Sequence, residues 1–211
     1  MKKILLLALL LTPAVFSFAQ KVKVGVHAGA NFSNLSISMS NLNIKGNTKT
    51  GLIAGVSAEI PLTAGLYLQP ELSFSQQGTK YNVPYGVISS QFPGALDSSN
   101  WDLKSTLNYL SLPVLVKYKI PNTGLGIYIG PQYSYLIGAQ DSFKSKREKH
   151  EVDSKKDYKS SDFSGVAGAE YFFPIGIGIS ARYQLGLTSI QDAGGSTVKN
   201  RTFTVTAGYR F

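Results

Sequence analysis

Apolar and polar residues alternate one by one along most of the chain after residue 21. Because successive side chains of a strand point to opposite faces of a sheet, each alternating run predicts a strand with one apolar face. Each run also has about the length of a tilted strand that crosses a membrane. Eight such runs cover residues 22–32, 50–60, 66–76, 108–120, 125–137, 162–173, 175–187 and 201–211.

The connections between the runs alternate in length. The short ones are PLTAG, PNTG and PIG, which are rich in residues that favour tight turns. The long ones cover roughly 34–49, 76–106, 139–161 and 188–200. Short turns at one end and long loops at the other are typical of outer-membrane barrels. An even strand count then places both chain ends on the periplasmic side.

Two barrel types share this alternation. A membrane barrel turns its apolar face outward, whereas a secreted lipocalin-like barrel turns it inward around a ligand. Aromatic residues of the apolar parity gather near both strand ends, as in the girdles at membrane interfaces. One group is Tyr118, Tyr171, Phe173, Tyr209 and Phe211, and the other is Phe32, Phe74, Tyr133, Tyr135, Phe163 and Phe203. The pattern favours an all-β fold: an eight-stranded antiparallel up-and-down transmembrane β-barrel.

The first residues, MKKILLLALLLTPAVFSFAQ, have the composition of an export signal. Lys2 and Lys3 form a basic start, an apolar stretch follows, and Ser17 and Ala19 are small residues suited to cleavage before Gln20. The alternative is a membrane anchor, but a spanning helix needs roughly 20 apolar residues. The sequence therefore predicts a signal peptide over 1–19 and one barrel domain over 20–211.

Composition agrees with a single exported domain. The 211 residues suffice for one closed barrel, and the formal net charge is +9. The chain has no cysteine. A secreted domain without disulfides must be held by hydrogen bonds and packing, which a closed sheet supplies.

Three stretches, LNYLSLPVLVKYKI, LYLQPELSFSQQGTK and the terminal TAGYRF, resemble the outer-membrane β-barrel domain common in Bacteroidota, often labelled porin-family or PorT-like. The resemblance covers nearly the whole mature chain, and its motifs are structural. It implies a location in the bacterial outer membrane and brings no catalytic pattern. In such families the last strand resembles the signal read by the barrel-assembly machinery, which would here be carried by Phe203, Tyr209 and Phe211.

Charged residues stand on the polar parity, which faces the lumen in a membrane barrel. The interior of an eight-stranded barrel is just wide enough for side chains. Unpaired buried charges are costly, whereas paired ones satisfy each other. We therefore expect an ion-pair network that fills the lumen; the alternative is charges solvated by lumen water. The expected members are Glu59, Glu71, Glu170, Lys117, Arg182 and Arg210, with Lys23 and His27 on the same parity.

Nothing in the sequence indicates an enzyme. Acyl-transfer or hydrolytic sites need a positioned base and nucleophile. The two histidines, His27 and His150, have no serine or aspartate at a telling spacing, and without cysteine a transition-metal site is not expected. We predict no catalytic residue, no cofactor, no metal and no nucleic-acid partner.

The long connections are the remaining place for function. Residues 144–159 carry seven basic and four acidic residues, Lys146 and Arg147 among them. They are candidates for binding lipopolysaccharide or a partner, or form a solvated loop. Trp101, Tyr81 and Tyr85 are candidate aromatic contacts, or pack over the barrel mouth.

The sequence thus predicts a small closed barrel with a structural or surface-interaction role carried by its long loops. The alternative is a narrow porin-like channel or a solute-binding barrel. Glycines on the lumen parity are compatible with this alternative. These glycines are Gly25, Gly55, Gly130 and Gly178. The expected partners are outer-membrane lipid, lipopolysaccharide and the assembly machinery, with any surface or secretion-complex protein partner unidentified.

Overall fold

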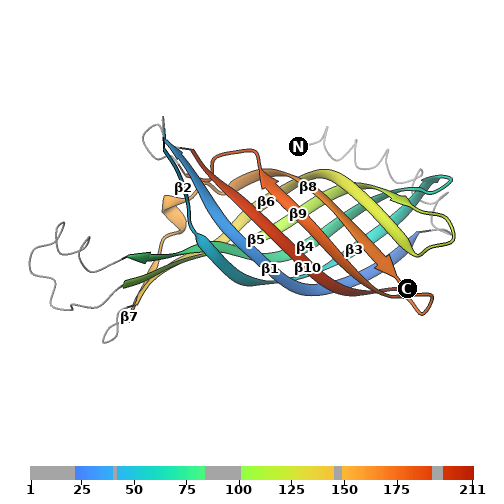
Figure 1. Ribbon diagram of the computed structural model, residues 1–211, viewed down its shortest axis with the longest axis horizontal. Coiled ribbons are helices and arrows are strands. Elements are labelled where there is room, and N and C mark those ends of the chain that lie inside the picture. Colours follow the sequence, from blue (N-terminus) through green and yellow to red (C-terminus); the bar gives the residue numbers. More distant parts are fainter. Residues whose placement is uncertain (1–21, 40–41, 84–100, 145–148, 192–196) are drawn as a thin grey trace, which may run out of the picture.

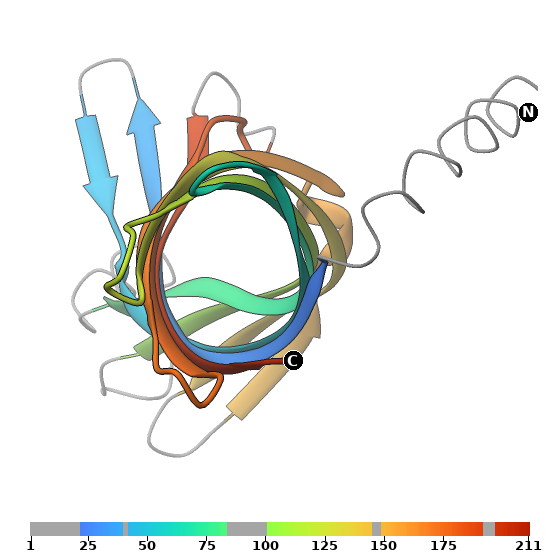
Figure 2. The same cartoon turned by 90° about the vertical axis from the view of Figure 1, so that its right-hand side faces the viewer.

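The computed structural model describes residues 22–39, 42–83, 101–144, 149–191 and 197–211. Within these ranges, ten strands form one sheet, and eight of them close into a ring in the order β10-β9-β8-β6-β5-β4-β3-β1, with β1 pairing β10. All pairings in the ring are antiparallel, and Figure 2 shows the ring end-on. The ring strands are β1 (Lys23–Met39), β3 (Asn47–Thr63), β4 (Leu66–Val83), β5 (Trp101–Lys119), β6 (Leu125–Lys144), β8 (Ser161–Phe172), β9 (Ile177–Gly186) and β10 (Thr197–Arg210). The predicted eight-stranded antiparallel up-and-down barrel is confirmed.

Three tight turns lie at the end of the barrel that carries the C-terminus (Figure 1). They join β3 to β4, β5 to β6 and β8 to β9. Gly65 and Gly176 in these turns have φ of 77° and 86°, a region that side-chain-bearing residues rarely occupy. The glycines of the predicted short turns are therefore what let the chain reverse in so few residues.

The wall of the barrel has its apolar parity on the outside. Ile129 is 65% exposed, whereas its neighbour Tyr128 is 6% exposed and faces the lumen. The same alternation of exposed and buried positions runs along β8 and β9. A lipocalin-like barrel would bury the apolar parity instead, so this alternative is excluded.

Aromatic side chains ring the outer wall at two levels. Near the short turns, Tyr171 stacks edge-on against Phe173 and Tyr209 against Phe211, with ring centroids 4.9 and 5.0 Å apart. At the other level, Tyr133 and Phe163 have centroids 5.0 Å apart, and Phe32 and Phe203 6.5 Å apart. The apolar wall between these levels is the membrane-facing belt.

Strands continue beyond the belt, which corrects the predicted long loops. Residues within 34–49, 76–106 and 139–161 belong to the ring strands or to β2 (Leu42–Lys45) and β7 (Lys149–Asp153). β2 pairs with β1, and β7 pairs with β6. Above the belt the outer face meets water instead of lipid, so the backbone ladder continues without the apolar outer face that marks a membrane strand in the sequence. We call the strands above the belt the extension (Figure 1).

The candidate loop residues are affected by this correction. Tyr81 and Trp101 lie on β4 and β5, not in a loop, in a ladder that pairs Tyr81 with Leu103 and Val83 with Trp101. Tyr85, Lys146 and Arg147 lie outside the described residues, as does the predicted signal peptide.

One short 3-10 helix, η2 (Lys155–Asp157), precedes β8. No helix among the described residues is long and apolar enough to cross a membrane.

Candidate functional site

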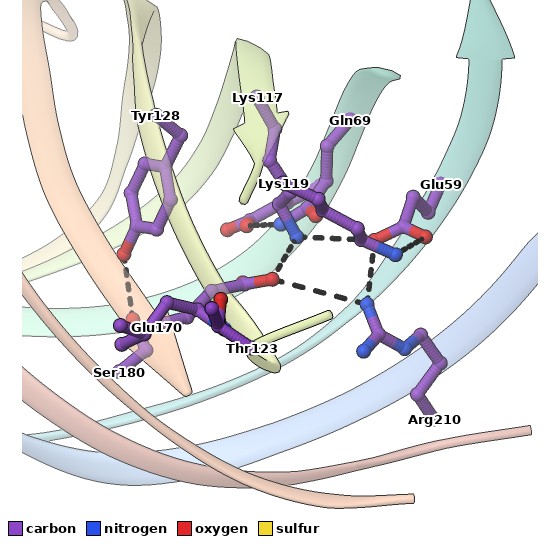
Figure 3. Close-up of polar contacts among 11 residues, drawn as sticks. Glu59, Gln69, Lys117, Lys119, Thr123, Tyr128, Glu170, Ser180 and Arg210 are labelled. Atoms are coloured by element: carbon purple, nitrogen blue, oxygen red, sulfur yellow. Dashed lines mark hydrogen bonds and ion pairs between the residues drawn. The ribbon is translucent and has the colours of Figure 1, made fainter. Parts of the chain in front are cut away.

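A cluster of charges fills the lumen at the end of the short turns. The Nζ of Lys117 lies 2.6 Å from Oε1 of Glu170 and 3.2 Å from Oε2 of Glu59 (Figure 3). The Nη1 of Arg210 lies 2.6 Å from Oε2 of Glu59 and 3.8 Å from Oε1 of Glu170. These side chains come from four strands, and the alternation of each strand turns them inward at one level. We call Glu59, Glu170, Lys117 and Arg210, with Lys119, the lower network.

Sequence reasoning missed Lys119. Its Nζ pairs with Oε1 of Glu59 and lies 4.2 Å from the ring centroid of Tyr67. The guanidinium carbon of Arg210 lies 3.8 Å from the ring centroid of Phe172. Cations above aromatic faces are stabilised by the ring quadrupole. Lys119 lies in the same predicted run, 108–120, and has the parity of Lys117, so listing every charge on that parity would have found it.

Glu71 and Arg182 form a second group, separate from the lower network. Arg182 donates from Nη1 to Oε2 of Glu71 at 2.8 Å, and Gln69 donates from Nε2 to the other carboxylate oxygen at 2.6 Å. His27 lies 3.2 Å, through Nε2, from the hydroxyl of Ser73. The structure therefore brings all six expected charges into ion pairs, divided between two levels.

A small cavity separates these side chains. It has a volume of about 40 Å³ and borders His27, Glu71, Arg182, Tyr128 and Thr206. A water molecule needs about 10–15 Å³ by the same measure, so the cavity has room for a few waters. Its size suits hydration of the charges and leaves no room for a sugar or amino acid.

Neutral polar side chains form the next layer above Glu71 and Arg182. Gln77 donates to Oε1 of Gln184 at 3.2 Å and accepts from the hydroxyl of Thr202 at 3.2 Å. Asn31 donates to the hydroxyl of Ser75 at 3.0 Å and accepts from Thr204 at 2.8 Å. These amides and hydroxyls thus bond one another, across the lumen at Gln77 and between neighbouring strands at Asn31 and Thr204, while Nε2 of Gln184 has no partner among the described residues.

An apolar cluster lies inside the barrel at the level of the extension, and it was not expected from the sequence. Its strand residues point inward, and Tyr158 and Ile190 enter from the segments beside β8 and β9; Ile190 is 0% exposed. Its members are Leu35, Leu107, Tyr109, Leu136, Ala139, Tyr158, Ile190 and Val198, which we call the lid. Three further apolar residues, Leu115, Tyr128 and Val166, pack together inside the barrel.

The expected assembly residues lie on the outer wall of the last strand. Phe203, Tyr209 and Phe211 are exposed to the membrane side. The backbone N–H of Phe211 donates to the carbonyl of Val24 at 2.8 Å and so continues the seam between β10 and β1. Among the described residues, no group of three or more His, Cys, Asp or Glu is placed to hold a metal ion.

Comparison with protein families assigns the chain to one family. The model of the outer membrane protein beta-barrel domain matches residues 18–192. The chain belongs to this family. It is an outer membrane β-barrel protein, which agrees with the outward apolar belt and the ring of eight strands. A search of curated proteins finds no match.

Several solved outer membrane barrels are similar to this one in structure. Ail, the attachment invasion locus protein of Yersinia pestis, has a TM-score of 0.47 and 15% identity, over 90% of this chain and 98% of Ail. Neisserial surface protein A has a TM-score of 0.41 and 16% identity, over 90% of this chain and 95% of its own. OprG of Pseudomonas aeruginosa has a TM-score of 0.42 and 12% identity, over 90% of this chain and 95% of OprG.

Proposed function

We propose that this outer membrane β-barrel protein is a closed, non-enzymatic barrel that acts at the cell surface through its extension and the segments the extension carries. The long connections face outward and both chain ends face the periplasm. Its partners are lipid, lipopolysaccharide and a surface or secretion-complex protein that contacts the extension. The Bacteroidota-type, PorT-like relationship remains part of this proposal.

The layered filling of the lumen is the observation that carries the proposal. The lower network, the Glu71–Arg182 pair, the amide layer and the lid follow one another along the barrel axis. The cavity between the charged layers has a volume of only about 40 Å³. A solute that crossed the barrel would have to break buried ion pairs and displace fully buried apolar side chains, both of which are costly.

The assembly role of the last strand belongs to the same proposal. The outward rings of Phe203, Tyr209 and Phe211 are accessible from the membrane side, as a signal read during insertion requires. The seam between β10 and β1 also closes the ring, so the strand that carries the signal is the one that completes the barrel.

Ion conductance in a planar bilayer tests the closed barrel. We expect no discrete opening steps from protein whose folding is verified by its resistance to unfolding in detergent. A general porin inserted under the same conditions provides the positive control. Reproducible steps from the folded protein would contradict the closed lumen and favour the narrow channel.

A further inference from the structure

The outer face of the extension carries a cationic row just above the membrane belt. Ladder pairing places Asn47, Lys80, Lys104, Ser142 and Glu151 side by side on β3, β4, β5, β6 and β7. Lys80 and Lys104 are therefore directly opposite each other. Like charges at directly opposite positions destabilise a sheet unless a counter-charge lies between them.

The described residues supply no such counter-charge. Among the described residues, no carboxylate lies within the 4.0 Å ion-pair distance of Lys80 or Lys104. Asp102 stands one row further out, opposite Lys144, and Glu151 has an interaction of its own.

A third lysine stands behind this pair. Lys49 is 1% exposed, and its Nζ donates to the backbone carbonyl of Gln77 at 3.2 Å. Burial, together with the charges of Lys104 and Lys80, lowers the pKa of Lys49 to about 8. The three ammonium groups thus act on one another without a carboxylate in ion-pair contact among the described residues.

A groove of about 600 Å³ opens over this row. Its lining combines cations with neutral hydrogen-bonding groups, and the two carboxylates on it belong to Asp102 and Glu151. We call it the lysine groove. Its lining includes Lys80, Lys104, Lys144, Gln76, Thr106 and Gln140.

The lysine groove begins where the apolar wall ends. Gln76 donates to Asn108 at 3.1 Å across β4 and β5. The next outward positions toward the membrane are Phe74 and Leu110, which pair with each other and are exposed on the belt. The groove therefore lies at the height of the lipid headgroups, with a lipid-facing wall directly below it.

We propose that the lysine groove binds the phosphate-bearing headgroup of an anionic outer-leaflet lipid, with one phosphate held between Lys80 and Lys104. The phosphate supplies the missing counter-charge, and the polar groups of Gln76, Thr106 and Gln140 are placed to bond headgroup hydroxyls. The acyl chains lie along the wall below. A soluble polyanion would gain the charge contacts but not this apolar contact. The assignment of the lipid to the outer leaflet rests on the proposed orientation of the barrel.

Titration of lipid A, a bisphosphorylated glucosamine lipid, into the folded protein in zwitterionic micelles tests this site. The double variant Lys80→Gln/Lys104→Gln removes both clamping charges. The matched control Lys155→Gln/Lys156→Gln removes two charges from η2, whose residues do not line the groove. A lysine near an anionic membrane surface contributes about fivefold in binding, so we expect roughly 25-fold weaker binding in the groove variant and wild-type binding in the control.

Equal affinity of the groove variant and the control would overturn the proposal. Tight binding of lipid A from which both phosphates have been removed would also overturn it, and inorganic pyrophosphate binding as tightly as lipid A would overturn the choice of a lipid. Without anion the groove variant should be at least as stable as wild type, because its like-charge pair is gone. Micelles present lipid to the whole barrel surface, so the result depends neither on orientation nor on conductance.

Discussion

Arg182 reaches Glu71 across the lumen, with Nη1 2.8 Å from Oε2, although 111 positions separate the two residues in the chain. Both side chains are buried. Breaking a buried ion pair leaves one charge without compensation, whereas replacing both partners with neutral residues of similar size is often tolerated. The pair therefore offers a direct test of the proposed closed lumen.

We expect Arg182→Met alone to lower the free energy of unfolding by about 3–5 kcal/mol, because it strands the Glu71 carboxylate. Glu71→Gln/Arg182→Met should recover most of this loss. Urea unfolding in lipid vesicles measures both. Full additivity of the two single changes would contradict a direct interaction, and no effect on stability or on ion leak would contradict a structural role for the pair.

The buried ammonium of Lys49 predicts an unusual dependence of stability on pH. Its pKa is lowered, by burial first and by Lys104 and Lys80 next, from 10.5 to about 8. Between these values the unfolded chain binds the extra proton, so the free energy of unfolding should rise as pH increases from about 8 to 10.5. We expect a rise on the order of 2 kcal/mol.

Lys49→Met should remove this rise, because it keeps the side-chain length without the titrating group. Lys104→Met should shrink it, since it removes one of the charges that lower the pKa of Lys49. Unfolding curves at several pH values between 7 and 11 measure the difference between wild type and each variant. Parallel curves for wild type and Lys49→Met would show that Lys49 is not the responsible group.

The lid predicts that a residue from a connecting segment contributes to the core. Ile190 is 0% exposed, and its backbone is held by bonds to Val198 and Lys159. We expect Ile190→Ala to cost about 2–4 kcal/mol through lost packing and a cavity. Leu187→Ala, at an exposed position close by, should cost much less. Thermal unfolding in detergent compares the two, and equal losses would contradict a packed lid.

Comparing the two edge-on aromatic pairs near the short turns distinguishes an assembly signal from a membrane anchor. Phe211 on the last strand and Phe173 after β8 are 72% and 45% exposed and make similar ring contacts. We expect Phe211→Ala to slow insertion by reconstituted assembly machinery severalfold, and Phe173→Ala to leave it near wild type. Both should change final stability by less than about 1 kcal/mol. Equal insertion rates for the two variants would contradict the signal.

The sequence predicted the membrane part of the fold well for a physical reason. Between the girdles one face of each strand meets lipid and the other meets the lumen, so alternation such as Tyr128 against Ile129 is strict. Above the belt this contrast disappears. The strand character of Tyr81 and Trp101 and the burial of Lys49 could not be predicted there from alternation.

The candidate site shows the same division. The inward charges were visible because they stand on the polar parity of the predicted strands, yet their partners depend on register across the lumen. The split between the lower network and the Glu71–Arg182 pair follows from the ladder register, which no local pattern encodes. Glu71 stands opposite Ser57, two residues from Glu59, and Arg182 opposite Gly168, two residues from Glu170. The lid was missed because Leu35, Leu107 and Val198 are apolar on the lumen parity, where a polar residue was expected.

The extension also bears on how the surface of this protein can change over time. β4 runs nine residues past Phe74, a rise of up to about 30 Å along the strand. Its order comes largely from backbone ladder bonds, which any residue except proline can make. Outward side chains above the lysine groove can therefore be replaced at little cost to folding. Substitutions at these positions can therefore accumulate while the membrane-facing wall and the inward-facing side chains of the barrel stay constant.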